Sequence, residues 1–571
     1  MNDLPTVLVV VAGAALLSWP LGLYLTWAME PRACLGAPSS SPAHATKRAE
    51  MPGWSSAFER IAGRAGGSPQ GWKQYLASML VFNACMFALS FLILLTQQWL
   101  PLNPDAKGPL TWDLIYNTAA SFTSNTNLQH YSGEVSMSYF SQLFGLMWLQ
   151  FVSAATGIAC LTALARGLAG STDFGNFFID LQRAVFLVLL PAAALVGLIY
   201  MAGGMPMTLG GAVEARTLEG ATQSIARGPV AAFVAIKQLG TNGGGWFGPN
   251  STHPFENPSF LTNLVSMFAI VVIPMSAVWM FGRITRRTKH AAVIFAVMLA
   301  LLAGKIAWSI YWESQPTAAF ADLPIESTSG NLEGKELRLG VTTGPLWAAL
   351  TTATSNGSVG AMHNSLNPLT GLAPLTGMWL NSVFGGVGVG MINMFVYIVI
   401  AVFLAGMMIG RTPEYCGKRV EAREMLAAAS ALFFHPLFIL GGTAIFAATA
   451  WGAGTINNPG ARGFTEILYE FTSSAANNGS GYEGLGDNTV PWNLATGTVM
   501  LLARYIPIVL PLAIAGWLAE KKPVAQGIGT LPADTPSFGL MLGGAIVLIG
   551  ALMFLPVAVL GPVAEHLLAA S

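Results

Sequence analysis

Four short strings of Asn, Gly, Ser and Thr recur along the chain, each between two long apolar segments. When the strings are overlaid, an Asn is followed by Gly or, once, by Thr. They consist of Ser124, Asn125, Thr126 and Asn127; Thr241, Asn242, Gly243 and Gly244; Ser355, Asn356, Gly357 and Ser358; and Asn477, Asn478, Gly479 and Ser480. Any one of them alone is typical of an ordinary turn. Four at matching places indicate an internal repeat.

The residue types in these strings fit a cation-binding ring. Glycine allows backbone angles that turn carbonyl oxygens toward one axis, and Ser, Thr and Asn supply further neutral oxygens or brace the loop. The strings contain no carboxylate, whereas tight divalent sites usually contain Asp or Glu. We therefore expect one dehydrated monovalent cation between them. This chemistry alone separates potassium from sodium only weakly, because that choice depends on ring size and carbonyl dynamics.

A short semi-apolar segment precedes each string and is predicted to be helical. These segments cover residues 112–123, 228–240, 346–354 and 464–476. The C-terminal end of a helix carries roughly half a negative charge, so each segment would favour a cation in the cavity beneath the strings. Non-helical backbone is tolerated inside a bilayer only where it lines a water-filled path. The four strings are therefore predicted to be the filter of a pore.

The composition places these segments in a membrane. Of the 571 residues, 53% are hydrophobic and 9% are charged, whereas a soluble domain has roughly a quarter charged residues. The formal net charge is +0 and the basic residues are scattered, which argues against a nucleic-acid partner and leaves membrane lipid as the surrounding partner. The four cysteines, Cys34, Cys85, Cys160 and Cys416, are far apart, so a disulfide framework is not expected.

Ten segments are long and apolar enough to span a bilayer, which needs about 20 residues per helix. They cover residues 4–29, 75–99, 139–165, 184–202, 260–282, 291–312, 378–410, 427–451, 494–518 and 540–560. We predict an all-α integral membrane protein with four pseudo-repeats of helix, pore helix, filter loop and helix, and one extra helix at each end.

The predicted parts of the chain follow from this pattern. They are a first helix and cytoplasmic loop over residues 1–72, repeats over 73–170, 171–285, 286–425 and 426–525, and a final helix over 526–571. Basic residues gather in alternate loops, for example at Arg286, Arg287, Lys521 and Lys522. Since positive charge favours the cytoplasmic side, both termini are expected outside.

Five longer strings resemble the KdpA family, the potassium-binding subunits of the Kdp complex. They are SFTSNTNLQHYSG (121–133), GTNGGGWFGPNSTHPFENP (240–258), TTATSNGSVGAMH (351–363), GRTPEYCGKRV (410–420) and EFTSSAANNGSG (470–481). The resemblance runs from about Lys73 to the C-terminus, and residues 37–67 differ from the family pattern. It implies the fold of the potassium-transporter superfamily and a potassium ion (K⁺) as the bound cation.

The resemblance also implies a high-affinity, ATP-driven potassium importer in a bacterial inner membrane. The chain would deliver potassium through an intramembrane tunnel to a P-type ATPase subunit (KdpB-like), with KdpC-like and KdpF-like small subunits completing the complex. The chain has no Asp-Lys-Thr-Gly string, Walker loop, HExxH pair or GxSxG elbow, so we expect a non-catalytic subunit.

Further residues are assigned with the help of this resemblance. Gln129, two residues after the first string, is expected at the pore mouth. Gly386 and Gly388 interrupt a spanning segment and are expected at a break near the tunnel mouth, although tight helix packing explains such glycines equally well. Arg504 lies about 15 Å into its helix and should point into the bundle, where it either obstructs straight passage of a cation or bridges helices.

Two further groups of residues, in a cytoplasmic turn and near the outer mouth, each have two possible roles. Arg411, in a predicted cytoplasmic turn, is expected to contact a partner subunit, and topology-setting charge is the alternative. The outer acids Glu134, Glu256, Glu483 and Asp487 either focus cations or brace loops.

Two other classes of function are alternatives to the prediction of an ATP-driven importer subunit. A passive potassium channel or symporter subunit of the Trk or Ktr type would share the four-repeat plan and use a nucleotide-binding partner. A membrane-embedded enzyme would need a nucleophile or metal constellation at membrane depth, and the sequence shows none.

Overall fold

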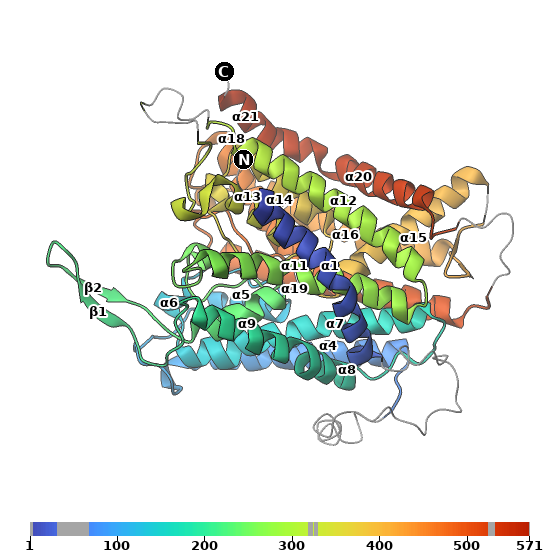
Figure 1. Cartoon of the computed structure of the whole chain (residues 1–571), viewed down its shortest axis with the longest axis horizontal. Coiled ribbons are helices and arrows are strands. Elements are labelled where there is room, and N and C mark those ends of the chain that lie inside the picture. The colour runs from blue at the N-terminus through green and yellow to red at the C-terminus, as the bar shows by residue number, and fades with distance from the viewer. Residues whose placement is uncertain are drawn as a thin grey trace.

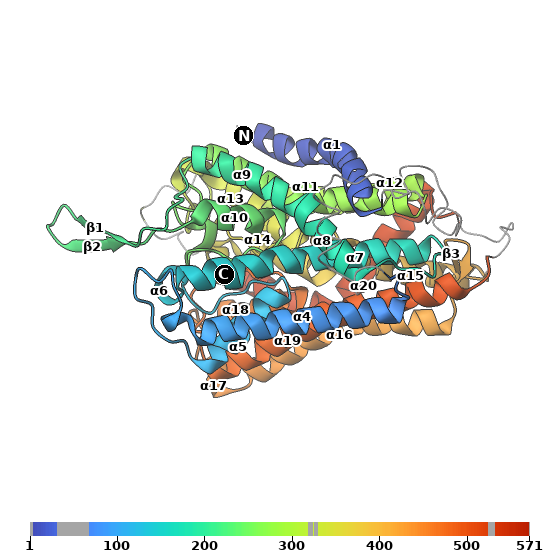
Figure 2. The same cartoon turned by 90° about the horizontal axis from the view of Figure 1, so that it is seen from below.

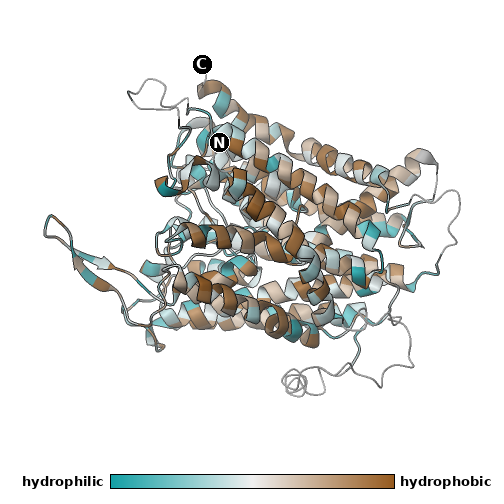
Figure 3. Cartoon of the chain, in the orientation of Figure 1, coloured by the Kyte–Doolittle hydropathy of each residue, from teal (hydrophilic) through white to brown (hydrophobic). Residues whose placement is uncertain are grey.

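The computed structural model describes residues 4–30, 68–317, 324, 329–410, 412–523 and 532–569. Within these residues, ten helices are long and apolar enough to cross a membrane. They run along one common direction (Figure 1), and hydrophobic residues follow their lengths while hydrophilic ones gather toward the ends (Figure 3). The all-α membrane fold with ten spans is confirmed.

The spanning helices agree closely with the predicted segments, and the first has the same bounds. They are α1 (Leu4–Met29), α4 (Trp72–Leu95), η4 and α7 (Ser141–Met147, Trp148–Leu168), α8, η5 and α9 (Phe177–Arg183, Ala184–Leu189, Leu190–Ala202), α11 (Phe260–Ile284), α12 (Thr288–Glu313), α15 (Val389–Ile409), α16 (Ala422–Ala447), α19 (Val490–Glu520) and α20 (Pro536–Ala558). A π-helical turn η10 (Val559–Val563) and α21 (Ala564–Ala569) extend the last one.

Four shorter helices lie between these spans, one in each predicted repeat. They are α5 (Trp112–Thr123), α10 (Val230–Leu239), α13 (Gly340–Ala353) and α18 (Gly460–Ala476). The labelled helices α5, α6 (Gly133–Ser136) and α18 lie toward one end of the molecule in both views (Figures 1 and 2), and α17 (Ala450–Ala453) lies at the same end in Figure 2. We call this the pore-loop end; α1 begins and α21 ends there as well (Figure 1). The boundaries of the four repeats stay predictions.

Two β-hairpins depart from the purely helical expectation. Strands β1 (Val213–Arg216) and β2 (Thr222–Ile225) pair antiparallel and project beyond the pore-loop end (Figure 1). At the opposite end, β3 (Glu414–Tyr415) pairs with β4 (Lys418–Arg419) in the turn that was expected to contact a partner. Arg411, Cys34 and most of the first cytoplasmic loop, including residues 37–67, lie outside the described residues.

The seventh predicted span is discontinuous. Helix α14 (Pro368–Leu380) ends at Asn381, whose φ of 44° is left-handed, and α15 begins at Val389. Gly386 and Gly388 lie in the break with φ values of 95° and 86°. The predicted interruption is therefore present, but the predicted start at residue 378 was wrong. The helix begins ten residues earlier, at Pro368, because proline suits the first turn of a helix, and Pro374 in the interior does not end it.

A buried ion cluster ties three helices together at the end opposite the pore loops. Arg166 of α7 donates to Asp180 of α8 from both terminal nitrogens, at 2.6 and 3.0 Å, and its Nε donates to Glu30 at 2.6 Å. A Cβ at Gly175 would overlap the Arg166 guanidinium, so a glycine is required there. The cluster fixes the loop between α7 and α8 against the end of α1.

We expect Asp180→Asn to destabilise the fold strongly, because it leaves the buried Arg166 without its main counter-charge. Breaking one partner of such a pair costs about 3–5 kcal/mol. The melting temperature and the yield of monodisperse protein in detergent would both fall. Glu333→Gln, at an exposed acid in the segment between α12 and α13, is the control. Equal melting temperatures for wild type and Asp180→Asn would contradict the role given to the cluster.

Candidate functional site: a ring of four strings

Each pore helix ends in the same hydrogen bond, in which a carbonyl near the helix end accepts the N–H five residues later. The four bonds are Thr126 to Ser121 (2.9 Å), Asn242 to Lys237 (3.0 Å), Asn356 to Thr351 (2.9 Å) and Asn478 to Ser473 (2.9 Å). Such a bond closes a helix with a left-handed residue and reverses the chain. It turns every string away from its helix in the same way.

This bond corrects the overlay of the first string. The sequence overlay aligned Asn125 with Asn242 because each is followed by Thr or Gly, whereas the hydrogen bond aligns Thr126 with Asn242. The left-handed residues support the corrected register, since Asn125 and Asn127 then correspond to Thr241 and Gly243 of the second string. The first string was therefore overlaid one residue too early, because Thr126 replaces the Asn of the other strings.

Left-handed and other residues alternate along each string. The left-handed φ values are 66° and 57° at Asn125 and Asn127, 48° and 78° at Thr241 and Gly243, 47° and 88° at Ser355 and Gly357, and 51° and 101° at Asn477 and Gly479. Alternation of this kind brings successive carbonyl oxygens to one side of the chain, as a filter requires. Asn127 takes the place of the glycine in the first repeat because Asn tolerates this conformation better than most residues.

The strings touch one another in cyclic order. A Cβ at Gly243 would overlap the carbonyl oxygen of Asn356, one at Gly357 that of Asn478, and one at Gly479 that of Thr126. A Cβ at Gly244 would lie 2.8 Å from the Cβ of Asn127, which closes the circle between the first and second strings. The residues of the four strings are buried, apart from Gly479, which is half-buried. They therefore form one ring, which the sequence predicted from the repeat alone.

The asparagine side chains of the ring brace it from behind. Asn356 donates to the carbonyls of Lys237 and Gln238 at 3.3 and 3.2 Å, in the pore helix of the preceding repeat. Asn478 donates to the Thr351 carbonyl at 3.0 Å. Side-chain amides are thus engaged between repeats, which leaves main-chain carbonyls as the oxygens available to a cation.

The first and fourth strings are linked through their side chains. Asn477 donates to the Thr126 hydroxyl at 2.9 Å and to the Met500 carbonyl at 2.9 Å. The hydroxyls of Ser124 and Thr126 are 2.7 Å apart. The Asn125 amide donates to the Thr241 carbonyl at 2.9 Å, so the first string is also tied to the second.

The break between α14 and α15 lies directly beneath the ring. Asn381 accepts from the Ser355 hydroxyl at 2.6 Å and donates to the Ala476 carbonyl at 3.2 Å. The Val387 N–H donates to the Thr241 hydroxyl at 3.0 Å, and a Cβ at Gly388 would overlap the Gly157 carbonyl in α7. The broken segment therefore contacts elements of all four predicted repeats.

Arg504 lies in the same region and points into the protein. It is 7% exposed, and its Nη2 donates to the Ser153 carbonyl at 3.4 Å. The Ser153 hydroxyl in turn donates to the Asn125 side chain at 2.7 Å. Among the described residues no salt bridge is recorded for Arg504. A single residue, Ser153, thus connects Arg504 to the first string.

On the opposite side of the ring, Gln129 bridges two repeats. It donates to the Gly245 carbonyl at 3.0 Å and accepts from the Gly245 N–H at 2.7 Å. The acids near the mouth mostly brace loops: Glu134 accepts from Gly248, Glu483 from Asn364, and Glu256 pairs with the buried Lys237. For these three acids the structure favours the loop-bracing alternative.

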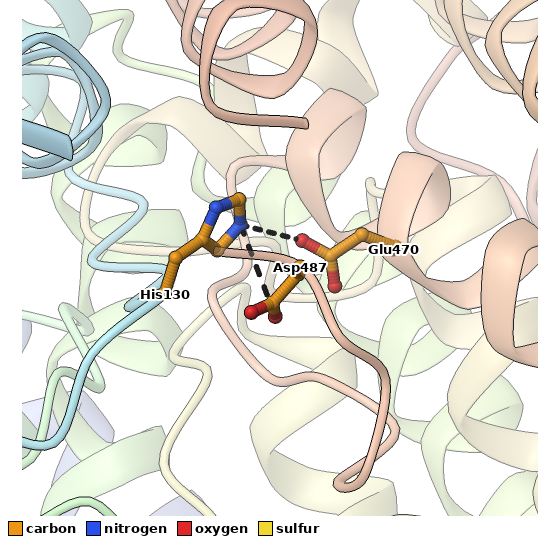
Figure 4. Close-up of side chains that lie close together, drawn as sticks. All are labelled: His130, Glu470 and Asp487. Atoms are coloured by element: carbon orange, nitrogen blue, oxygen red, sulfur yellow. Dashed lines mark hydrogen bonds and ion pairs between the residues drawn. The ribbon is translucent and has the colours of Figure 1, made fainter. Parts of the chain in front are cut away.

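The fourth acid, Asp487, belongs to a cluster that sequence reasoning missed (Figure 4). His130 Nε2 lies 3.0 Å from Glu470 Oε1 and 4.0 Å from Asp487 Oδ2, and His130 Nδ1 lies 2.7 Å from Asn493 Oδ1. Burial opposes protonation of His130, but the charges of Asp487 and Glu470 outweigh it and raise the pKa to about 9. The position of His130, directly after Gln129, could have indicated from the sequence that it lies near the pore mouth. Glu470 is far from His130 in sequence, so their contact could not be predicted.

The three groups are close enough to hold a metal ion, with all ligand atoms within 4.8 Å of one another. However, both ring nitrogens of His130 already face acceptors, so a proton satisfies the arrangement. We therefore interpret the cluster as an imidazolium that joins the loop after the first string to the fourth pore helix.

The comparison with known proteins identifies the family. The family described as "Potassium-transporting ATPase A subunit" (KdpA) matches residues 7–567. The chain belongs to the KdpA family. Members of this family are the potassium-transporting, non-catalytic subunits of the Kdp ATPase complex, so this chain is a multi-pass potassium transporter subunit and potassium is its transported ion.

A solved structure shows the same fold at low identity. The potassium transporter TrkH from Vibrio parahaemolyticus matches with a TM-score of 0.52 and 11% identity, and the match covers 86% of this chain and 97% of TrkH. The likeness concerns the fold alone and supports the potassium-transporter superfamily architecture that the repeats predicted.

We expect Gly357→Ala to weaken potassium binding, because its Cβ would meet the Asn478 carbonyl and force a left-handed alanine. A strain of about 1–3 kcal/mol corresponds to a loss of affinity of about fivefold to 150-fold. Gly460→Ala is the matched control, since Gly460 has a φ of 69° but no atom near its Cβ position. Calorimetric titration with potassium would compare the two; equal affinities in both variants would contradict the ring.

The His130 cluster predicts a pH dependence of stability. A pKa raised from 6.5 to about 9 stabilises the folded state below pH 6.5, by about 3 kcal/mol, and the contribution disappears as pH rises through 9. The melting temperature of wild type should therefore fall more between pH 7 and pH 10 than that of His130→Gln. Parallel pH profiles for the two proteins would show that His130 is neutral in the folded state.

Proposed function

We propose that this KdpA-family subunit selects external potassium in the four-string ring and delivers it sideways, within the membrane, to a P-type ATPase subunit that drives uptake. The ring carries the proposal: four strings, each with two left-handed residues separated by one other residue, meet in cyclic order. A ring of neutral carbonyl oxygens replaces the hydration shell of a monovalent cation.

Two features favour a sideways path over a straight one. The broken segment contacts all four repeats beneath the ring, and Arg504 adds a positive charge there that repels a cation. Beside this obstruction is a cavity of about 40 Å³, lined among others by Asn381, Asn393, His435 and Ala503. It begins at Asn381, which touches the third and fourth strings, and lies between α14, α15, α16 and α19.

Membership of the KdpA family supports a proposal for the partners. The proposed complex contains a KdpB-like P-type ATPase chain, which hydrolyses ATP, and KdpC-like and KdpF-like small subunits. The turn that contains β3 and β4, with Arg411 before it, is proposed to contact a partner. Lys521 anchors this turn by donating to Glu424 at 2.8 Å and to the Arg419 carbonyl at 3.0 Å. We propose a bacterial inner membrane, with the pore-loop end and both termini outside.

The principal rival is a passive transporter of the Trk or Ktr type, which the fold likeness to TrkH makes worth testing. Affinity purification of the chain from its native membrane distinguishes the two. Recovery of a P-type ATPase chain with potassium-stimulated ATP hydrolysis supports the proposal. Recovery of a nucleotide-binding cytoplasmic protein, without a P-type ATPase, would support the rival.

The barrier role of Arg504 is tested by Arg504→Gln in the assembled complex. Loss of the charge should increase ATP-independent potassium leak by about tenfold or more, since a barrier of 1.4 kcal/mol is a factor of ten. ATP-driven accumulation in proteoliposomes should fall as a result. Arg504→Lys keeps the charge and is the control.

Normal coupling and no extra leak in Arg504→Gln would show that this arginine only bridges helices. Equal leak in Arg504→Gln and Arg504→Lys would mean that shape, not charge, closes the path.

A further inference from the structure

One position in the pore helices differs chemically in the second repeat. The residue whose carbonyl closes the helix is Ser121, Thr351 or Ser473 in three repeats and Lys237 in the second. The small hydroxyls stay close to their own strings: Ser121 donates to the Leu128 carbonyl at 2.8 Å, and Ser473 accepts from the Gly479 N–H at 2.9 Å. A lysine at this position has to place its ammonium elsewhere.

Lys237 places its ammonium behind the second string, fully buried. Its Nζ donates to Glu256 and to Asn250 Oδ1, each at 2.5 Å, and to the Ser251 hydroxyl at 2.8 Å. Glu256 is equally buried and also accepts from the Phe247 N–H at 2.9 Å. Every donor of the ammonium is therefore used, and the Asn250 side-chain oxygen is held toward Lys237.

The orientation of Asn250 determines where its amide nitrogen points. With its oxygen on Lys237 and on the Val359 N–H at 3.2 Å, the nitrogen donates to the Gly243 carbonyl at 2.7 Å. An asparagine whose oxygen accepts from an ammonium cannot be turned around without placing its N–H groups against that charge. Lys237 thus fixes the direction of this hydrogen bond.

Gly243 has the same place in its string as Asn127, Gly357 and Gly479, and we call the carbonyls of these four residues the outer ring of the filter. Among the described residues, no hydrogen-bond donor is recorded for those three oxygens, whereas Gly243 has Asn250. The ring is therefore chemically asymmetric: three free oxygens and one that already accepts a hydrogen bond.

We propose that Lys237 and Asn250 are specificity-determining positioning residues, which withdraw the Gly243 carbonyl from the outer ring so that a cation is fully dehydrated only at the next ring inward. The inner ring contains the carbonyls of Thr126, Asn242, Asn356 and Asn478. This inference rests on the proposed function, because it assumes that the four strings bind potassium. The outer ring then holds a cation weakly, and selection occurs at a single level.

The direct test is Asn250→Ala in the purified complex, with potassium and rubidium affinities measured by calorimetric titration. Removing the donor frees the Gly243 carbonyl, so potassium should bind about fivefold more tightly, the value of a hydrogen bond of about 1 kcal/mol. The preference for potassium over rubidium should fall by a similar factor, because a second level now binds both ions. Thr252→Ala, in the same turn, should match wild type.

A second variant tests the same hydrogen bond if Asn250→Ala does not fold. Lys237→Ser combined with Glu256→Gln makes the second pore helix resemble the other three and leaves no unpaired buried charge. It should change the potassium-to-rubidium ratio in the same direction as Asn250→Ala.

Two results would overturn the inference. Unchanged affinities and ratio in a folded variant would show that the hydrogen bond does not compete with the cation. Weaker potassium binding with an unchanged ratio would show that Asn250 only supports the loop. Wild-type complex that binds no potassium would instead overturn the proposed function itself, and this inference with it.

Discussion

The hydrogen bond that closes each pore helix is the interaction on which the rest of the structure depends. It links a helix carbonyl to the N–H five residues later in all four repeats. Each string is irregular backbone surrounded by lipid-facing helices, so its N–H groups need partners within the protein. The N–H groups are satisfied by partners on the side of the string that faces away from the pore. The carbonyl oxygens can then point toward a common axis, where they bind a cation instead of accepting a hydrogen bond.

Much of this arrangement is readable from the sequence, because it depends on local residue types. Apolar length alone predicts the spans, and Asn-Gly strings at matching places predict the ring. The overlay of the first string was wrong by one residue because Thr126 stands where the other strings have Asn. The residue types of a short string do not by themselves determine how it aligns with the other strings. The helix-closing bond to Ser121 and the left-handed residues Asn125 and Asn127 reveal the correct alignment.

The features that could not be predicted from the sequence depend mainly on contacts between residues that are far apart in the chain. Glu470 meets His130 because two repeats adjoin, and neither residue signals the other in its own string. Lys237 differs in type from Ser121, Thr351 and Ser473, and the helix-closing hydrogen bonds are what identify the four as equivalent positions. The start of α14 and the β1–β2 hairpin were missed because proline-containing and short alternating segments give weak local patterns.

The proposed function depends on the position at which the ion binds. The most direct measurement is an anomalous difference map from crystals of the complex grown in thallium or rubidium, two ions that substitute for potassium. We expect the strongest peak on the axis between Thr126, Asn242, Asn356 and Asn478, with a weaker one or none at Gly243. A strongest peak elsewhere, with no density between the four strings, would contradict the assignment of the ring as the filter.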